Sequence, residues 1–151
     1  MSYTKLLYHI IFSTKYRRKT IPNEQSDKLY RYIWGFIEKH KCVLYRINGM
    51  PDHIHILVQL HPTIAVATFV KKLKNATHFW LDENKADFPD FESWSVGYCA
   101  LSYCDRDKEM IVNYIKKQRE HHKTEESEKE LRRILGENNI EIDEQYFDKE
   151  L

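Results

Sequence analysis

Two histidines of this chain have a spacing that permits shared chemistry. His53 and His55 stand two apart in the apolar run HIHILVQL (53–60), which is typical of a β-strand. Because side chains alternate between the two faces of a strand, both imidazoles point to one side and Ile54 and Ile56 to the other. Two imidazoles combined with oxygen ligands bind a divalent metal and leave positions open for a substrate. The alternative is a pair of polar residues on a solvated sheet face.

A tyrosine and a glutamine form the second candidate group. Tyr114 and Gln118 stand four apart in a segment with helical spacing, so they share one helix face, next to the apolar residues Ile111 and Ile115. A phenol, with a free pKa of about 10, is a weak nucleophile unless its electrophile is strongly polarised, as by a metal on a phosphate oxygen. Alone, Tyr114 resembles an ordinary packing tyrosine. Together with the histidine pair it is a candidate nucleophile, and Gln118 a candidate oxygen ligand.

Other chemical motifs are missing from the sequence. It contains no Walker loop, G-x-G-x-x-G, C-x-x-C or G-x-S-x-G motif, so we expect no nucleotide cofactor. His121 and His122 follow the Tyr114 segment, and we expect them only to stabilise the carboxyl end of its helix.

Basic residues gather in three places, with aromatic residues nearby. The clusters are Lys15, Arg17, Arg18 and Lys19 around Tyr16; Lys71, Lys72 and Lys74; and Lys117 with Lys116 and Arg119. Such surfaces suit single-stranded nucleic acid, whose bases stack and whose phosphates pair with cations. For any single lysine, solvation is the alternative.

Length and charge limit the possible classes of protein. The chain has 151 residues, of which 42% are hydrophobic and 31% charged, so it can bury a core and is neither collagen-like nor wholly disordered. The net charge of +1 hides an asymmetry. Residues 1–123 hold 20 Lys and Arg against 13 Asp and Glu, whereas residues 124–151 hold 4 against 10. We expect one domain, with a basic body (1–123) that can bind a polyanion and an acidic helix and tail (124–151).

The sequence also bears on the compartment. No apolar run approaches the ~20 residues of a membrane helix, and the short N-terminal run is followed by basic residues, unlike a secretory signal. Cys42, Cys99 and Cys104 are an odd number of cysteines without metal-type spacing. We interpret them as reduced thiols of a cytoplasmic protein.

The pattern of apolar residues predicts an α+β fold. Strands are expected at 3–13, 41–48, 53–60 and 94–103, and helices at 23–40, 63–83, 105–121 and 124–138. Asp105 is expected to cap the third helix, and the tail beyond 138 has no assignment. The order βαββαβ is that of a ferredoxin-like antiparallel sheet with two helices on one face, followed here by two additional C-terminal helices.

Four stretches of the chain resemble one known family. They are NGMPDHIHILV (48–58), WSVGYCALSY (94–103), VNYIKKQREHH (112–122) and IDEQY (142–146). Together they resemble the single-tyrosine HUH transposases of the insertion sequence 200/605 group, with their REP-associated tyrosine transposase-like relatives.

The resemblance implies a mechanism and partners. His53, His55 and Gln118 would bind Mg²⁺ or Mn²⁺, and Tyr114 would attack a DNA phosphate to leave a 5′-phosphotyrosine link and a free 3′-hydroxyl. The substrate would be single-stranded DNA with imperfect hairpins at the ends of the element. The protein would be a homodimer, with its tyrosine helix acting in cis or in trans. The body, 1–123, would then be the catalytic domain.

Three other functions remain open on the sequence alone. A domesticated relative that processes repeated hairpins would share every catalytic residue. A non-catalytic single-stranded DNA-binding module would leave the histidine pair without a metal. A metal-dependent hydrolase would use water and form no covalent adduct.

Overall fold

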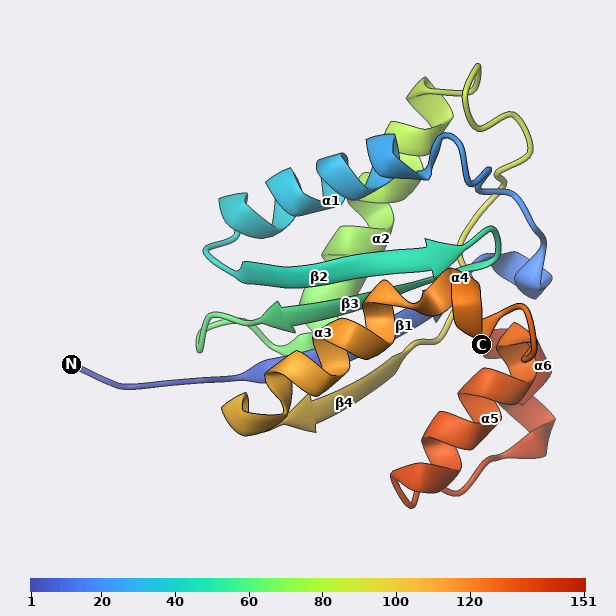
Figure 1. Cartoon of the computed structure of the whole chain (residues 1–151). Helices are drawn as coiled ribbons and strands as arrows, with labels where there is room; N and C mark the ends of the chain where they lie inside the picture. The colour runs from blue at the N-terminus through green and yellow to red at the C-terminus, as the bar shows by residue number, and fades with distance from the viewer.

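A four-stranded antiparallel sheet forms the centre of the protein (Figure 1). The structure is a computed structural model that describes residues 1–151, apart from the side chains of Asp148 and Lys149. Its strands are β1 (Leu7–Ser13), β2 (Val43–Met50), β3 (His53–Gln59) and β4 (Cys99–Tyr103). Their order across the sheet is β2-β3-β1-β4, with every neighbouring pair antiparallel. This order is that of the split βαβ arrangement and confirms the predicted fold class.

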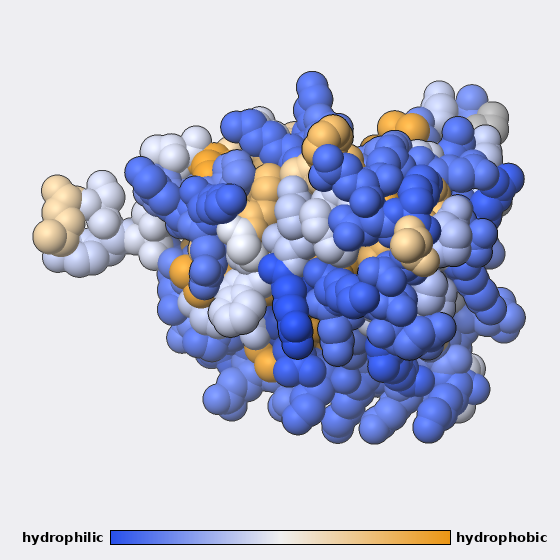
Figure 2. Space-filling view, turned by 90° about the horizontal axis from the view of Figure 1, so that it is seen from above, coloured by the Kyte–Doolittle hydropathy of each residue, from blue (hydrophilic) through white to orange (hydrophobic). Residues whose placement is uncertain are grey.

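Two long helices cover one face of the sheet, α1 (Ser26–Lys39) and α2 (Val66–Glu83). Between them and the sheet lies the main core, to which β3 contributes Ile54 and Ile56, both fully buried. The predicted direction of the two isoleucines is therefore confirmed. Seen from the side of these helices, the molecule is mostly hydrophilic with isolated apolar patches (Figure 2).

The remaining helices lie against the opposite face (Figure 1). They are α3 (Lys108–Lys116), α4 (Gln118–His121), α5 (Ser127–Glu137) and the terminal α6 (Glu144–Glu150). Ile111 and Ile115 of α3 pack on Leu57 of β3. Leu131 and Ile134 of α5 join a second cluster with residues of β1 and β4. Polar side chains on this sheet face therefore become enclosed between the sheet and two helices.

The helix predicted over 105–121 is not continuous. A 3₁₀ turn (Asp105–Asp107) precedes α3, and Lys117, with φ −94° and ψ 18°, separates α3 from α4. The prediction that Asp105 caps the helix is wrong, because α3 follows Asp107. The Asp105 carboxylate instead pairs with Lys5 and Lys108, at 3.2 and 3.6 Å.

The other boundaries differ by a few residues. β1 begins at Leu7, because β3 ends at its partner Gln59, and residues 3–6 then have no strand to pair with. The strand predicted at 94–103 is shorter, since Trp94 makes only an isolated bridge to Thr14 before β4 begins. The tail without an assignment forms α6.

Two further predictions concern the whole chain. Among the described residues, no helix is both long enough and apolar enough to span a bilayer. The three cysteines carry free thiols, of which Cys104 is exposed.

Candidate functional site

The histidine pair lies under α5, on the sheet face opposite α1 and α2. In the register of the sheet, His53 stands beside Ser13 of β1 and His55 beside Ile11. Their exposed fractions are 2% and 0%. The alternative of a solvated sheet face is therefore wrong, and these two polar groups need partners inside the protein.

Those partners converge on one carboxylate. Oε1 of Glu130, on α5, lies 3.2 Å from Nε2 of His53 and 3.1 Å from Nε2 of His55. The ligand atoms of these three buried residues all lie within 4.8 Å of one another. Two imidazole nitrogens and a carboxylate oxygen so close together are a donor set that fits a divalent metal.

The far side of each imidazole is also fixed. Nδ1 of His53 lies 2.7 Å from Oδ1 of Asp52, and Nδ1 of His55 lies 2.8 Å from Nε2 of the buried His9. With a metal present, each Nδ1–H would donate to its neighbour and each Nε2 lone pair would be available to the ion. Metal-binding histidines are typically oriented by such outer contacts. Ser127 extends the arrangement, since its hydroxyl donates to Asp52 at 2.6 Å.

Burial and neighbouring charges shift the pKa values of these groups in different directions. Burial lowers the pKa of His9 to about 3 and that of His55 to about 4. Burial acts on His53 in the same direction, but the hydrogen bonds to Asp52 and Glu130 outweigh it and raise the pKa to about 9. Burial would raise the pKa of Glu130, yet its hydrogen bonds to histidines hold that pKa well below its usual range. Without a metal, the site therefore pairs a cationic His53 with a carboxylate.

Tyr114 and Gln118 reach the same carboxylate from the other side. The Tyr114 hydroxyl donates to Oε2 of Glu130, and Nε2 of Gln118 donates to that oxygen at 2.8 Å. Oε1 of Gln118 lies 3.2 Å from Nε2 of His53. The structure thus brings together all four residues that the sequence predicts to act at one site.

The break at Lys117 does not separate Tyr114 from Gln118. α3 is anchored by Ile115, which is fully buried, and Asn48 of β2 donates to the carbonyl of Lys116 at 3.1 Å. The chain then turns, and α4 begins with Gln118, whose side chain is also fully buried. Both residues therefore still face the histidines.

Sequence reasoning missed several members of this cluster. His122 was expected only to stabilise a helix end, but its Nε2 lies 3.1 Å from Oε1 of Glu130, and the ring of His121 stacks on Tyr114 with centroids 4.7 Å apart. The sequence does indicate that Glu130 is buried, because it stands four residues before Ile134 on the apolar face of its helix. His9 carried a similar signal, as a histidine inside the otherwise aliphatic and aromatic stretch LLYHIIF (6–12).

The N-terminal basic cluster lies next to the site. It follows β1 at the end of the sheet where β3 begins, and Thr14 donates its backbone N–H to the carbonyl of Asp52 at 2.9 Å. A cleft of about 470 Å³ is lined by Arg17 and Lys19 of this cluster and also by Asp52 and His122. Lys15 and Arg18 are exposed nearby, with Arg18 paired to Glu92.

The other predicted basic residues are more dispersed. Lys71 and Lys72 are exposed on α2, across the sheet from the site, and Lys117 is exposed at the break before Gln118. The ammonium of Lys74 instead donates to the carbonyls of Ser95 and Gly97, at 2.8 and 2.6 Å, and burial lowers its pKa to about 8. Lys74 therefore holds a loop in place.

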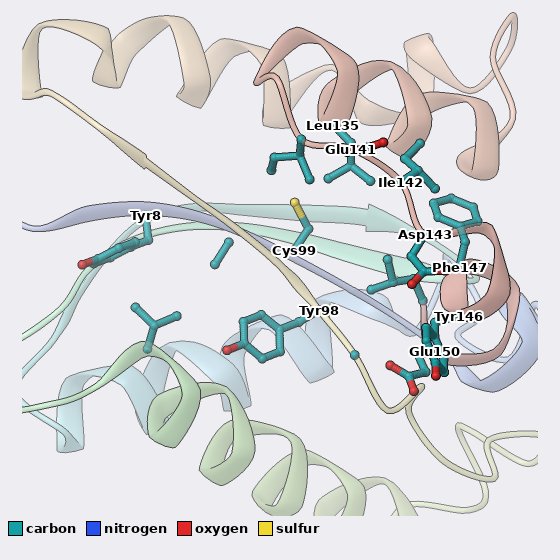
Figure 3. A pocket seen from close by; sticks show the side chains of 15 residues that line it. Tyr8, Tyr98, Cys99, Leu135, Glu141, Ile142, Asp143, Tyr146, Phe147 and Glu150 are labelled. Carbon is teal, nitrogen blue, oxygen red and sulfur yellow. The ribbon is translucent and has the colours of Figure 1, made fainter.

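A larger, mostly apolar cavity of about 630 Å³ lies elsewhere. It opens beside β4, where the chain passes from α5 to α6, and Tyr8, Tyr98, Leu135 and Phe147 line it (Figure 3). None of the histidines, Tyr114 or Gln118 reaches it. The chemistry considered above therefore belongs to the histidine cluster.

Comparisons with known proteins agree on one family. The family described as "Transposase IS200 like" matches residues 2–118. The ISDra2 transposase TnpA of Deinococcus radiodurans is 28% identical over 118 residues, which is 76% of this chain and 84% of that protein. The transposase for insertion sequence element IS200 of Salmonella typhimurium is 29% identical over 120 residues, covering 77% of this chain and 78% of that protein.

Two solved structures share the fold. A Deinococcus radiodurans crystal structure described as a transposase has a TM-score of 0.62 at 28% identity and covers 78% of this chain and 93% of that one. A REP-associated tyrosine transposase bound to a REP hairpin has a TM-score of 0.56 at 14% identity, covering 78% and 68%. The family match ends at Gln118, so Glu130 lies outside it.

Proposed function

The chain belongs to the family of IS200-like transposases, and from that premise we propose that it cleaves and rejoins single-stranded DNA through a covalent tyrosine intermediate. Membership makes it a DNA-processing enzyme of the insertion-sequence type. The observation that carries the finer proposal is the convergence of Tyr114, Gln118, His53 and His55 on the carboxylate of Glu130. A phenol, an amide and two imidazoles meet there inside the protein.

A divalent metal, Mg²⁺ or Mn²⁺, would be held by His53, His55 and Gln118, to which the structure adds Glu130 as a fourth residue in reach. When bound, such an ion polarises a phosphate oxygen as a Lewis acid. The outer contacts from Asp52 and His9 would keep both imidazoles in the orientation that binding needs.

Tyr114 supplies the nucleophile in this proposal. Its oxygen forms a bond to the phosphorus, the bond from phosphorus to the 3′-oxygen breaks, and the electron pair leaves with that oxygen, which becomes a 3′-hydroxyl by taking a proton from water. The hydrogen bond to Oε2 of Glu130 orients the phenol, and the phenol proton passes to water. The phosphotyrosine ester conserves the bond energy, so a 3′-hydroxyl can reverse the step without ATP.

The proposed substrate is single-stranded DNA marked by hairpins at the element ends. A helix-borne tyrosine cannot easily reach a phosphate in a regular duplex, whereas a flexible strand can enter the cleft beside Arg17 and Lys19. The solved relative bound to a REP hairpin supports a hairpin substrate by analogy of fold. We also propose a homodimer, on the family resemblance.

The decisive experiment is a search for the adduct. Purified protein is mixed with Mn²⁺ or Mg²⁺ and labelled single-stranded DNA from the flanks of its own gene, and the products are separated on a denaturing gel. We expect a protein-linked DNA band with the wild type and none with Tyr114→Phe, which should still bind the DNA.

Other outcomes would identify the alternatives. Cleavage without an adduct, equal in both proteins, would mean a water nucleophile. Tight binding with neither cleavage nor adduct in either metal would indicate a non-catalytic binding module. A domesticated relative would form the same adduct, so only the genomic surroundings of its hairpins would distinguish it.

A further inference from the structure

A guanidinium contacts the hydroxyl of the proposed nucleophile. Nη2 of Arg133 donates to Oη of Tyr114 at 2.8 Å, and the centre of the guanidinium lies 5.6 Å from the centroid of the tyrosine ring. The contact joins α5 to α3, and Arg133 lies beyond the residues that match the family. The family match therefore assigns it no role.

Two carboxylates fix the direction of this guanidinium. Glu125 accepts from Nε at 3.0 Å and from Nη2 at 2.9 Å, and Glu137 accepts from Nη1 at 3.1 Å. A guanidinium is planar, with its donors in a rigid fork, so contacts along two of its edges determine where the remaining N–H points. Here it points at the Tyr114 oxygen.

The neighbouring arginine is held in a different way. Arg132 pairs with Glu128 and Glu144 and lies over the ring of Phe147, with the two centres 4.1 Å apart. Through Glu144 and Phe147 it anchors α6. Two adjacent arginines of α5 thus have different surroundings, and Arg132 offers a matched control.

We propose that Arg133 is a further catalytic residue, which stabilises the Tyr114 oxygen while negative charge is on it. The inference rests on the proposed function. In cleavage the phenol loses its proton and its oxygen carries partial negative charge until the bond to phosphorus is complete. In rejoining, a 3′-hydroxyl loses its proton to water and its oxygen bonds to phosphorus, the bond between phosphorus and the tyrosine oxygen breaks, and the electron pair returns to the tyrosine oxygen, which then takes a proton from water. A fixed donor at the oxygen lowers both barriers.

The charges around Tyr114 show why such a donor is needed. The Tyr114 oxygen is partly buried and lies beside the Glu130 carboxylate, and both surroundings disfavour negative charge on it. Arg133 places a positive charge at the same oxygen. Among the residues that the structure describes, Arg133 is the cation that donates to the Tyr114 oxygen.

The test measures both half-reactions in Arg133→Ala. We expect adduct formation to slow roughly 10²–10³-fold, the effect of removing one donor to a developing oxyanion, and strand rejoining from a covalent complex to slow similarly. Guanidinium ion added to the solution should restore part of the Arg133→Ala rate. The rate of Arg133→Lys should lie between those of Arg133→Ala and the wild type. The rate of Arg132→Ala should stay within about twofold of wild type.

Three readouts separate this role from a structural one. The melting temperature, the affinity for Mn²⁺ and the affinity for single-stranded DNA should be nearly unchanged in Arg133→Ala. The inference fails if Arg133→Ala forms adduct at the wild-type rate, or if its loss is matched by lost Mn²⁺ or DNA binding and is not rescued by guanidinium. If the wild type itself forms no Tyr114-dependent adduct, the proposed function fails, and the inference fails with it.

Discussion

The family-matched body and the C-terminal segment contribute different chemistry to one site. The body, residues 1–123, of which 2–118 match the family, supplies the histidine pair, Tyr114 and Gln118, which the comparisons and the sequence motifs both point to. The segment beyond it supplies Glu130 and Arg133 on α5, the two groups that contact the Tyr114 oxygen. One region thus holds the proposed reactive groups, and the other sets the charge around them.

The difference explains why the acidic end of the chain is not merely a solvated surface. Most carboxylates of this segment are exposed, but Glu130 is 2% exposed and makes hydrogen bonds to three histidines of the body or its end. An isolated buried carboxylate would be costly, and here the histidines offset that cost. The docking of α5 and the arrangement of the site therefore depend on each other.

The largest expected effect compares one ligand from each region. His53→Ala should abolish adduct formation and weaken Mn²⁺ binding by roughly 10²-fold or more, beyond the effect of typical outer contacts. Glu130→Gln, which keeps one oxygen, should weaken Mn²⁺ binding by about tenfold. Calorimetric titration of purified protein with Mn²⁺ measures both, and fluorescence anisotropy should show that His53→Ala still binds hairpin DNA.

Tyr114→Phe is the control, because it should bind Mn²⁺ as the wild type does. If Glu130→Gln instead binds Mn²⁺ more tightly, the Glu130 carboxylate competes with the metal for the two imidazoles and is not itself a ligand. The division of labour between the two regions would then need revision.

A smaller effect follows from the charge on His53. Its pKa is raised to about 9 by Asp52 from the body and Glu130 from α5, against about 6.5 in an unfolded chain. A raised pKa stabilises the folded state fully below pH 6.5, and this contribution is lost as pH rises through 9. By linkage the metal-free protein should lose up to about 3 kcal/mol between these values.

Urea unfolding in the presence of EDTA at several pH values measures this loss. Asp52→Asn and Glu130→Gln should each reduce the pH dependence between 6.5 and 9, and their relative effects show which region holds the charge. A wild type whose free energy of unfolding is constant over this window would contradict the pairing of a cationic His53 with Glu130.

Local spacing is what made the body predictable. His53 and His55 needed only the two-residue period of a strand, and Tyr114 and Gln118 only the period of a helix, so both pairs could be placed before any tertiary structure was known. Whether two pairs meet depends on long-range packing. The spacing permitted their meeting, and the family resemblance implied it.

The C-terminal contributions could not be reached in this way. Glu130 and Arg133 enter the site because α5 docks through Leu131 and Ile134, a contact between segments far apart in sequence. The break at Lys117 was also hidden, since its neighbours are good helix formers and the turn is fixed by contacts such as that of Asn48 with Lys116. α6 has one strongly buried apolar residue, Phe147, which gives no periodic signal.

The smallest expected effect concerns the cleft that both regions line. Lys19 belongs to the body and Glu126 to the acidic segment, and both face the same 470 Å³ cleft beside His122. If single-stranded DNA passes there, Lys19→Ala should weaken binding a few-fold and lower the slope of log affinity against log salt by about 0.7, the value for one phosphate contact on a single strand. Glu126→Gln should strengthen binding slightly, because it removes a negative charge that repels the DNA phosphates.

Both affinities are measured by fluorescence anisotropy in a Tyr114→Phe background, with Lys39→Ala on α1, across the sheet, as the control. Equal slopes for Lys19→Ala and Lys39→Ala would place the DNA elsewhere, and the acidic segment would then shape the catalytic cluster without influencing DNA binding.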